Sequence, residues 1–118
     1  VSVASIYGKT VYDQDIAASA ASLVSNAASS GKIFKINSLI IANIDGTNSA
    51  DISVTLRNAA GGTIYSYLAW TVAVPADATL IVISKDTSIY LEEDMSLYVQ
   101  ASAANDLSAT CSYEEISE

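Results

Sequence analysis

The stretch SLIIANIDGTNSADISVTLRN, residues 38–58, decides the fold class of this sequence. A polar break containing Asp45 and Gly46 divides it into two runs. In the second run, apolar residues alternate with polar ones, namely Ile52, Val54 and Leu56 against Asp51, Ser53, Thr55 and Arg57. A period of two is typical of a strand with one buried face. The stretch therefore predicts two strands joined by a turn.

The first of these two strands begins upstream, in the run KIFKINSLIIANI. At period two, one face carries Phe34, Ile36, Ile40 and Ile44, and the other carries Ile33, Leu39 and Ile41. Apolar residues on both faces near the middle of a run are typical of a central strand. We therefore predict a long strand in the interior of a sheet.

The remaining sequence continues as short strands separated by turns. We expect strands around residues 11–12, 20–24, 64–72, 80–83, 89–91, 95–101 and 107–113. Within 64–72 the alternation places Ile64, Leu68, Trp70 and Val72 on one side and Tyr65 and Tyr67 on the other. The pair Asn105 and Asp106 is predicted to form the last hairpin turn.

About eight strands with no helical pattern between them predict an all-β protein. We expect an antiparallel β-sandwich, either jelly-roll-like or Ig-like, with an extended N-terminal segment. The length of 118 residues suits one domain. We assign residues 1–30 to an N-terminal arm with the first weak strands, and residues 31–118 to the sandwich body.

Composition narrows the range of partners and compartments. The formal charge is −8, from 13 acidic and 5 basic residues, so we expect neither nucleic acid nor an anionic membrane as a partner. No apolar run is long enough for a transmembrane helix, and the first residues do not resemble a signal peptide. The lone Cys111 cannot form an internal disulfide, which favours folding in a reducing cytoplasm.

The sequence contains few of the residues on which enzymatic catalysis normally depends. It has no histidine, which removes the usual general base, the Ser–His arrangement and the common zinc ligand. Cys111 falls in an alternating strand pattern and is interpreted as a small core residue rather than a nucleophile. The carboxylates occur at turns, where they are normally solvated or accept backbone N–H groups. We therefore expect no enzymatic activity and no cofactor.

Two residue sets remain as candidate sites. Glu92, Glu93, Asp94 and Asp106 offer oxygen ligands for a cation, although their spacing matches no EF-hand loop and a solvated acidic turn is the favoured explanation. An aromatic set on strands could form a protein interface or a carbohydrate platform, with strand packing as the simpler explanation, and comprises Tyr65, Tyr67, Tyr90 and Tyr98.

From Gly31 onward the order of segments resembles a known family. The segments are GKIFKINSLIIANIDG, ADISVTLRN, VPADATLIVI and SIYLEEDMSLYVQASAANDLSATCSYEEIS. They resemble small β-sandwich virion structural proteins of tailed bacteriophages, including phages of marine cyanobacteria. The most specific part is 91–116, in which Glu93 departs from the glycine of the common motif and weakens a left-handed turn there.

The resemblance implies a particle-bound subunit without catalytic residues. It favours a capsid decoration (cement) protein that contacts the major capsid protein, with a tail, neck or fibre component as the alternative. It also implies a homo-oligomer that is made in the host cytoplasm and resides in the virion. A carbohydrate-binding module for host recognition remains a separate alternative, based on the tyrosines.

Overall fold

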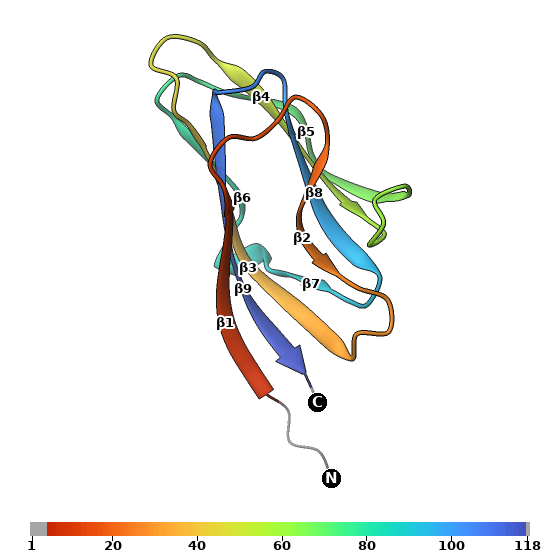
Figure 1. The fold of residues 1–118 in the computed structure, drawn as a ribbon. Helices are drawn as coiled ribbons and strands as arrows, with labels where there is room; N and C mark the ends of the chain where they lie inside the picture. The colour runs from red at the N-terminus through yellow and green to blue at the C-terminus, as the bar shows by residue number, and fades with distance from the viewer. Residues whose placement is uncertain (1–4, 118) are drawn as a thin grey trace.

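The computed structural model describes residues 5–117, which form nine strands in two antiparallel sheets packed face to face (Figure 1). Sheet A contains β1 (Ser5–Asp13), β9 (Leu107–Ser117), β3 (Lys32–Asn43), β6 (Thr79–Ile83) and β7 (Ile89–Leu91). Sheet B contains β2 (Ala21–Asn26), β8 (Met95–Ala101), β4 (Ala50–Arg57) and β5 (Ile64–Val74). The predicted all-β sandwich is confirmed.

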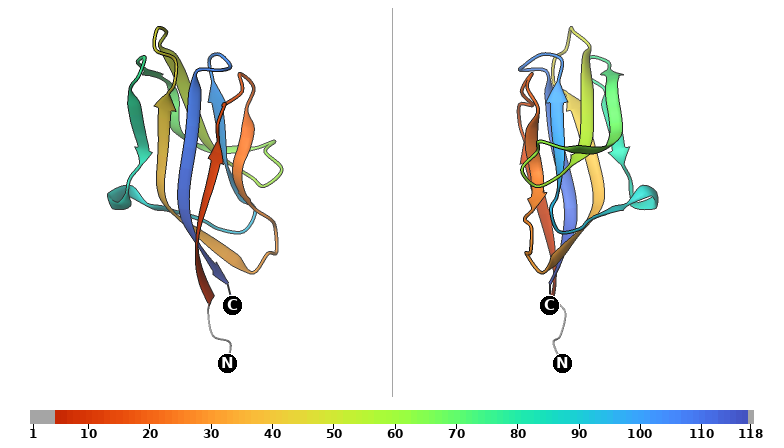
Figure 2. Two further views of the ribbon diagram at one scale, coloured as in Figure 1. Left: turned by 60° about the vertical axis from the view of Figure 1, so that its left-hand side comes forward. Right: turned by 90° about the vertical axis from the view of Figure 1, so that its right-hand side faces the viewer.

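The strand order is that of a jelly roll. Sheet A runs β1-β9-β3-β6, with β7 also paired to β3, and sheet B runs β2-β8-β4-β5. The chain therefore passes back and forth between the sheets, and its first and last strands lie side by side (Figure 2). This order selects the jelly roll from the two predicted sandwich types. The predicted hairpin turn at Asn105 and Asp106 is instead a crossing between sheets, because β8 and β9 belong to different ones.

The faces of β3 differ from the sequence prediction beyond Ile36. Ile36 pairs with Tyr113 of β9 and Ser38 pairs with Ser112, so Asn37 is an extra, bulged residue. A shift of one residue exchanges the two faces of a strand. Leu39 and Ile41 consequently join Phe34 and Ile36 in the core, whereas Ile40 is 37% exposed and Ile44 is 57% exposed.

The core lies between the two sheets and matches the prediction for the regular strands. Ile52 and Val54 of β4 are fully buried, as their alternation predicted. Leu97, Val99 and Ala101 of β8 also face inward. The largest fully buried side chains further include Ile16, Leu91 and Leu107. This shared core fixes the distance between the sheets, so each sheet presents its other face outward.

Cys111 is a buried core residue, as predicted. Its side chain is inaccessible in the middle of β9, and burial raises the pKa of the thiol to about 12. Because the thiolate is the reactive form, this cysteine is chemically inert at neutral pH.

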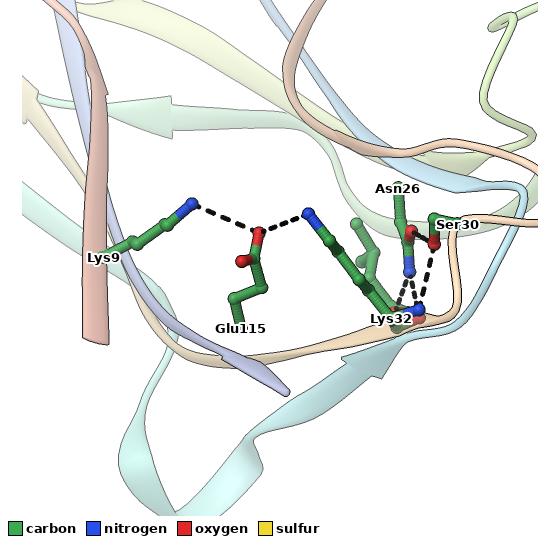
Figure 3. Close-up of polar contacts among 6 residues, drawn as sticks. Lys9, Asn26, Ser30, Lys32 and Glu115 are labelled. Carbon is green, nitrogen blue, oxygen red and sulfur yellow. Dashed lines mark hydrogen bonds and ion pairs between the residues drawn. The ribbon is translucent and has the colours of Figure 1, made fainter. Parts of the chain in front are cut away.

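A buried asparagine ties the two sheets together at one end of the sandwich. Asn26, at the end of β2, is inaccessible to solvent. Its Nδ2 donates to the carbonyl oxygens of Lys32 (2.8 Å) and Leu91 (3.0 Å), which belong to sheet A. Its Oδ1 accepts a hydrogen bond from Ser30 Oγ at 2.5 Å (Figure 3). All polar groups of the amide are therefore engaged, and β2 is anchored to β3 and β7.

The N-terminal segment contributes strands to both sheets. All of β1 pairs with β9, and β2 pairs with β8. Lys9 Nζ on β1 donates to Glu115 Oε1 at 3.2 Å, and Lys32 Nζ lies 3.6 Å from the same oxygen (Figure 3). Both strands of the N-terminal segment, β1 and β2, are thus paired with strands of the body. Residues 1–4 of the predicted arm lie outside the described residues. None of the helical segments within residues 5–117 has the length and apolarity needed to span a membrane.

Candidate interaction surfaces

The predicted tyrosine platform is divided between the two sheets. Tyr65 and Tyr67 lie on β5 and Tyr98 lies on β8, all in sheet B. Tyr90 lies on β7 in sheet A, where it pairs with Lys35. The structure therefore brings three of the four tyrosines to one sheet and places the fourth on the opposite side of the sandwich.

Trp70 joins this aromatic group, contrary to the sequence prediction. Three register shifts interrupt the pairing of β5 with β4. Each shift changes which side of the strand the next side chain occupies, so simple alternation fails along β5. The rings of Tyr67 and Trp70 meet edge to face with centroids 5.0 Å apart, and their side chains are 57% and 52% exposed. Period-two counting had placed these two residues on opposite sides.

Arg57 and Tyr98 form a rigid unit beside these aromatic rings. The guanidinium carbon of Arg57 lies 4.7 Å from the Tyr98 ring centroid. Arg57 Nε donates to Thr55 Oγ1 at 2.9 Å, and Nη1 donates to the Gly61 carbonyl at 3.1 Å. Gly61 has φ of +85°, and a Cβ there would overlap the Tyr98 ring. This glycine is therefore required by both its backbone conformation and the close approach of the ring.

A hollow of about 160 Å³ opens on the outer face of sheet B next to Trp70. Its walls come from the three adjacent strands β5, β4 and β8 and from the residue after β8, and are formed by Asp51, Ser53, Trp70, Thr71, Gln100, Ala101 and Ser102. Thr71 has φ of +50°, which is unusual for a β-branched residue. Its backbone N–H donates to Ser53 Oγ at 3.0 Å, which holds the bulge in place.

The four acidic candidates for a cation site do not come together. Asp94 precedes β8 and Asp106 follows it, so the two lie at opposite ends of that strand. Asp94 has φ of +62°, so it, rather than Glu93, occupies the left-handed position of the turn, and its Oδ1 accepts the Ala59 N–H at 3.1 Å. Throughout residues 5–117, no group of three or more acidic, histidine or cysteine side chains could hold a metal ion.

Asp106 instead neighbours Asp45 at the end of the sandwich. Loss of hydration raises the pKa of Asp106, and the Asp45 carboxyl raises it further. The pKa of Asp45 is lowered, because its carboxylate accepts hydrogen bonds from Thr47 and Asn48. The Asp45 oxygens are thus already occupied by protein donors, as expected for a turn carboxylate.

The outer face of sheet A, which we call the neutral face, carries several exposed large apolar side chains and almost no charge. Its exposed large side chains are Ile6, Tyr12, Ile33, Ile40, Ile81 and Tyr90, between 37% and 74% accessible. Register places Lys35 opposite Glu114 on this face. They are the only charged residues among its outward strand positions within residues 5–117. Exposed large apolar side chains on a face with so little charge make it a candidate interaction surface.

Neither a protein-family model nor a curated protein matches the chain. Among solved structures, it is similar to a protein of Bacillus endospore appendages, described as a family of disulfide-linked pili; the TM-score is 0.57 at 15% identity, over 98% of this chain and 91% of that one. It is also similar to a protein of the infectious bursal disease virus particle, with a TM-score of 0.52 at 9% identity over 96% of this chain.

The VP2 subviral particle of the same virus has a TM-score of 0.51 at 12% identity over 98% of this chain. The chain spans about a third of the length of these viral proteins, with 31% and 33% covered. At such low identity these likenesses show a shared fold alone, the all-β sandwich.

Proposed function

We propose that this chain is a structural protein of a tailed-bacteriophage virion, and specifically a capsid decoration protein that docks on the particle through protein–protein contacts. The observation that carries the proposal is the neutral face of sheet A. The sequence resemblance to phage virion proteins supports the phage assignment. The jelly roll shared with a viral particle protein and a pilus protein supports a role in assembly.

The charge distribution favours the neutral face as the docking surface. The chain carries a formal charge of −8, yet the outward positions of sheet A carry one lysine and one glutamate. Burial of the turns, where most of the acidic residues lie, would desolvate unpaired carboxylates, which is costly. Burial of the neutral face removes large apolar side chains from water without that penalty.

The size of this face suits a specific contact. The strands of sheet A, β1, β9, β3, β6 and β7, have 9, 11, 12, 5 and 3 residues. At spacings of about 4.8 Å between strands and 3.3 Å per residue, the face measures roughly 630 Å². A standard protein interface buries about 800 Å² on each partner. The proposed contact involves no disulfide, because the single cysteine, Cys111, is buried.

The test uses particles of the encoding phage that lack this protein. The purified chain should bind them at a fixed number of copies per particle, as measured by co-sedimentation and mass spectrometry. Tyr12→Lys, on the neutral face, should weaken binding about 10-fold or more, because the new charge is desolvated at the contact. Tyr67→Lys, the same change on sheet B, should leave binding unchanged.

The proposal fails if native particles contain no copy of this chain, or if the two variants bind equally well. Gene order separates the two candidate locations: neighbouring capsid and portal genes support a decoration protein, whereas neighbouring tail genes support a tail, neck or fibre component. Salt provides a further check, since docking through a face with balanced charge should change little between low and high ionic strength.

A further inference from the structure

We propose that the hollow beside Trp70 on the outer face of sheet B binds one neutral sugar ring, as the terminal unit of a glycan. Strands β4 and β8 and the bulged part of β5 form this site. The proposal is independent of the docking function, because sheet B faces away from the neutral face of sheet A (Figure 2). Each proposal can therefore fail alone.

The size of the hollow limits its ligand. Pockets for cofactors and drug-sized ligands measure roughly 300–1,000 Å³, whereas this hollow holds about 160 Å³. A nucleotide or a flavin cannot be enclosed there. A single pyranose ring, with the rest of a glycan extending into solvent, is of the right size.

The chemistry of the walls suits a ring that is apolar on its faces and hydroxylated at its edge. Trp70 supplies an exposed aromatic plane, 52% accessible, against which the C–H face of a sugar packs. The Asp51 carboxylate accepts no hydrogen bond from any group in residues 5–117 and so can accept from sugar hydroxyls. Bonds to a charged acceptor are the stronger kind.

Two further side chains are already oriented by the protein. Gln100 Nε2 donates to the Ala18 carbonyl at 2.9 Å, which leaves Oε1 as an acceptor. Ser102 Oγ accepts the Asp51 N–H at 2.9 Å, which leaves its hydroxyl proton for a ligand. The site thus combines acceptors with one donor and has no cationic wall residue, so it favours a neutral sugar over an acidic one.

The backbone holds this arrangement before any ligand arrives. Trp70 and Thr71 together lie opposite Ser53, so β5 carries one extra residue at the hollow. Bulges of this kind redirect side chains and are common next to functional sites. The left-handed conformation of Thr71 is strained, and strain of this kind concentrates where a ligand is held. A site formed in advance loses less freedom on binding.

The assay exploits the fact that Trp70 is the only tryptophan in the chain, so its fluorescence reports on this hollow alone. The full chain is titrated with glucose, galactose, mannose, N-acetylglucosamine and fucose, and with N-acetylneuraminate as the acidic sugar. At least one neutral sugar should give a saturable change with Kd on the order of 1 mM, and saturation-transfer NMR should show transfer to its ring protons.

Asp51→Asn should weaken binding of that sugar about 10-fold, since a hydrogen bond to a charged group is lost. Asp86→Asn, the same change on the exposed Asp86 outside both sheets, should leave the affinity unchanged. The proposal is overturned if no neutral sugar gives a saturable response, if Asp51→Asn binds as Asp86→Asn does, or if Trp70 responds only to a virion protein.

Discussion

Replacement of Asn26 by alanine should destabilise the fold by about 3 kcal/mol. The Asn26 side chain is itself inaccessible to solvent and makes three hydrogen bonds, of which the bond to Leu91 is buried and the other two are partly buried. A buried carbonyl left without a hydrogen-bond donor, here that of Leu91, costs about 1–3 kcal/mol. The two partly buried bonds, with Lys32 and Ser30, contribute about 0.5–1.5 kcal/mol each. For a domain of this size, the corresponding loss in Tm is roughly 10–15 °C.

Urea and thermal unfolding of the purified chain measure this loss. Asn37→Ala is the matched control, because Asn37 is a half-buried bulge residue whose side chain makes no hydrogen bond within residues 5–117; it should change the free energy of unfolding by less than about 0.5 kcal/mol. If Asn26→Ala lowers the free energy of unfolding by less than about 1 kcal/mol with an unchanged m-value, the Asn26 amide does not tie the two sheets together.

Asn26→Asp separates shape from hydrogen bonding. The new carboxyl nearly matches the amide in shape but directs oxygen at the carbonyls of Lys32 and Leu91. Burial and these carbonyls raise the pKa of the introduced group above its unfolded value. The variant should therefore be least stable at neutral pH and should recover stability as the pH falls through the raised pKa. A variant with the same pH dependence as the parent would contradict the assigned amide orientation.

Two further predictions concern single contacts. A hydrogen bond from Lys9 lowers the pKa of Glu115 in the folded protein. The stabilisation by Glu115 is therefore present above the ordinary pKa of the carboxyl group, and it is lost as the pH falls through the lower pKa of the folded state. Urea unfolding should show Glu115→Gln to be less stable than the parent at pH 7, with the difference shrinking toward pH 3. Gly61→Ala should lower stability by about 1–3 kcal/mol, because φ is positive and a Cβ meets Tyr98. Gly62→Ala, whose Cβ meets no atom within 4 Å, should cost less than about 1 kcal/mol in the same assay.

Period-two reasoning succeeded where a strand pairs without interruption. In β4, Ile52 and Val54 were predicted to face the core, and they are fully buried. In β3 the same reasoning failed after Asn37, because one extra residue exchanged the faces of all later positions. The local sequence keeps its alternation across a bulge, and only pairing with the neighbouring strand reveals the change of phase.

The surfaces were less predictable than the strands, because each depends on topology. The sequence placed Tyr65 and Tyr67 on one side of a strand as candidate interface residues, but it could not show that Tyr90 belongs to the other sheet. Trp70 was assigned to the wrong side because the bulges of β5 follow from its pairing with β4. The neutral face combines residues from five strands, so no single stretch of sequence displays it.

The bulges of β5 have two effects: they protect the edge of sheet B from pairing with other chains, and they form the hollow beside Trp70. An edge strand exposes unpaired backbone groups and invites pairing with other chains, and bulges reduce that risk. β5 is an edge strand of sheet B and carries three register shifts, whereas β1, an edge of sheet A, pairs over nine residues without any. The same bulges that disrupt the β5 edge turn Trp70 toward Tyr67 and open the hollow beside Thr71. The β1 edge of sheet A keeps a regular pairing over its whole length, while the β5 edge of sheet B gives up regularity for a small, shaped cavity.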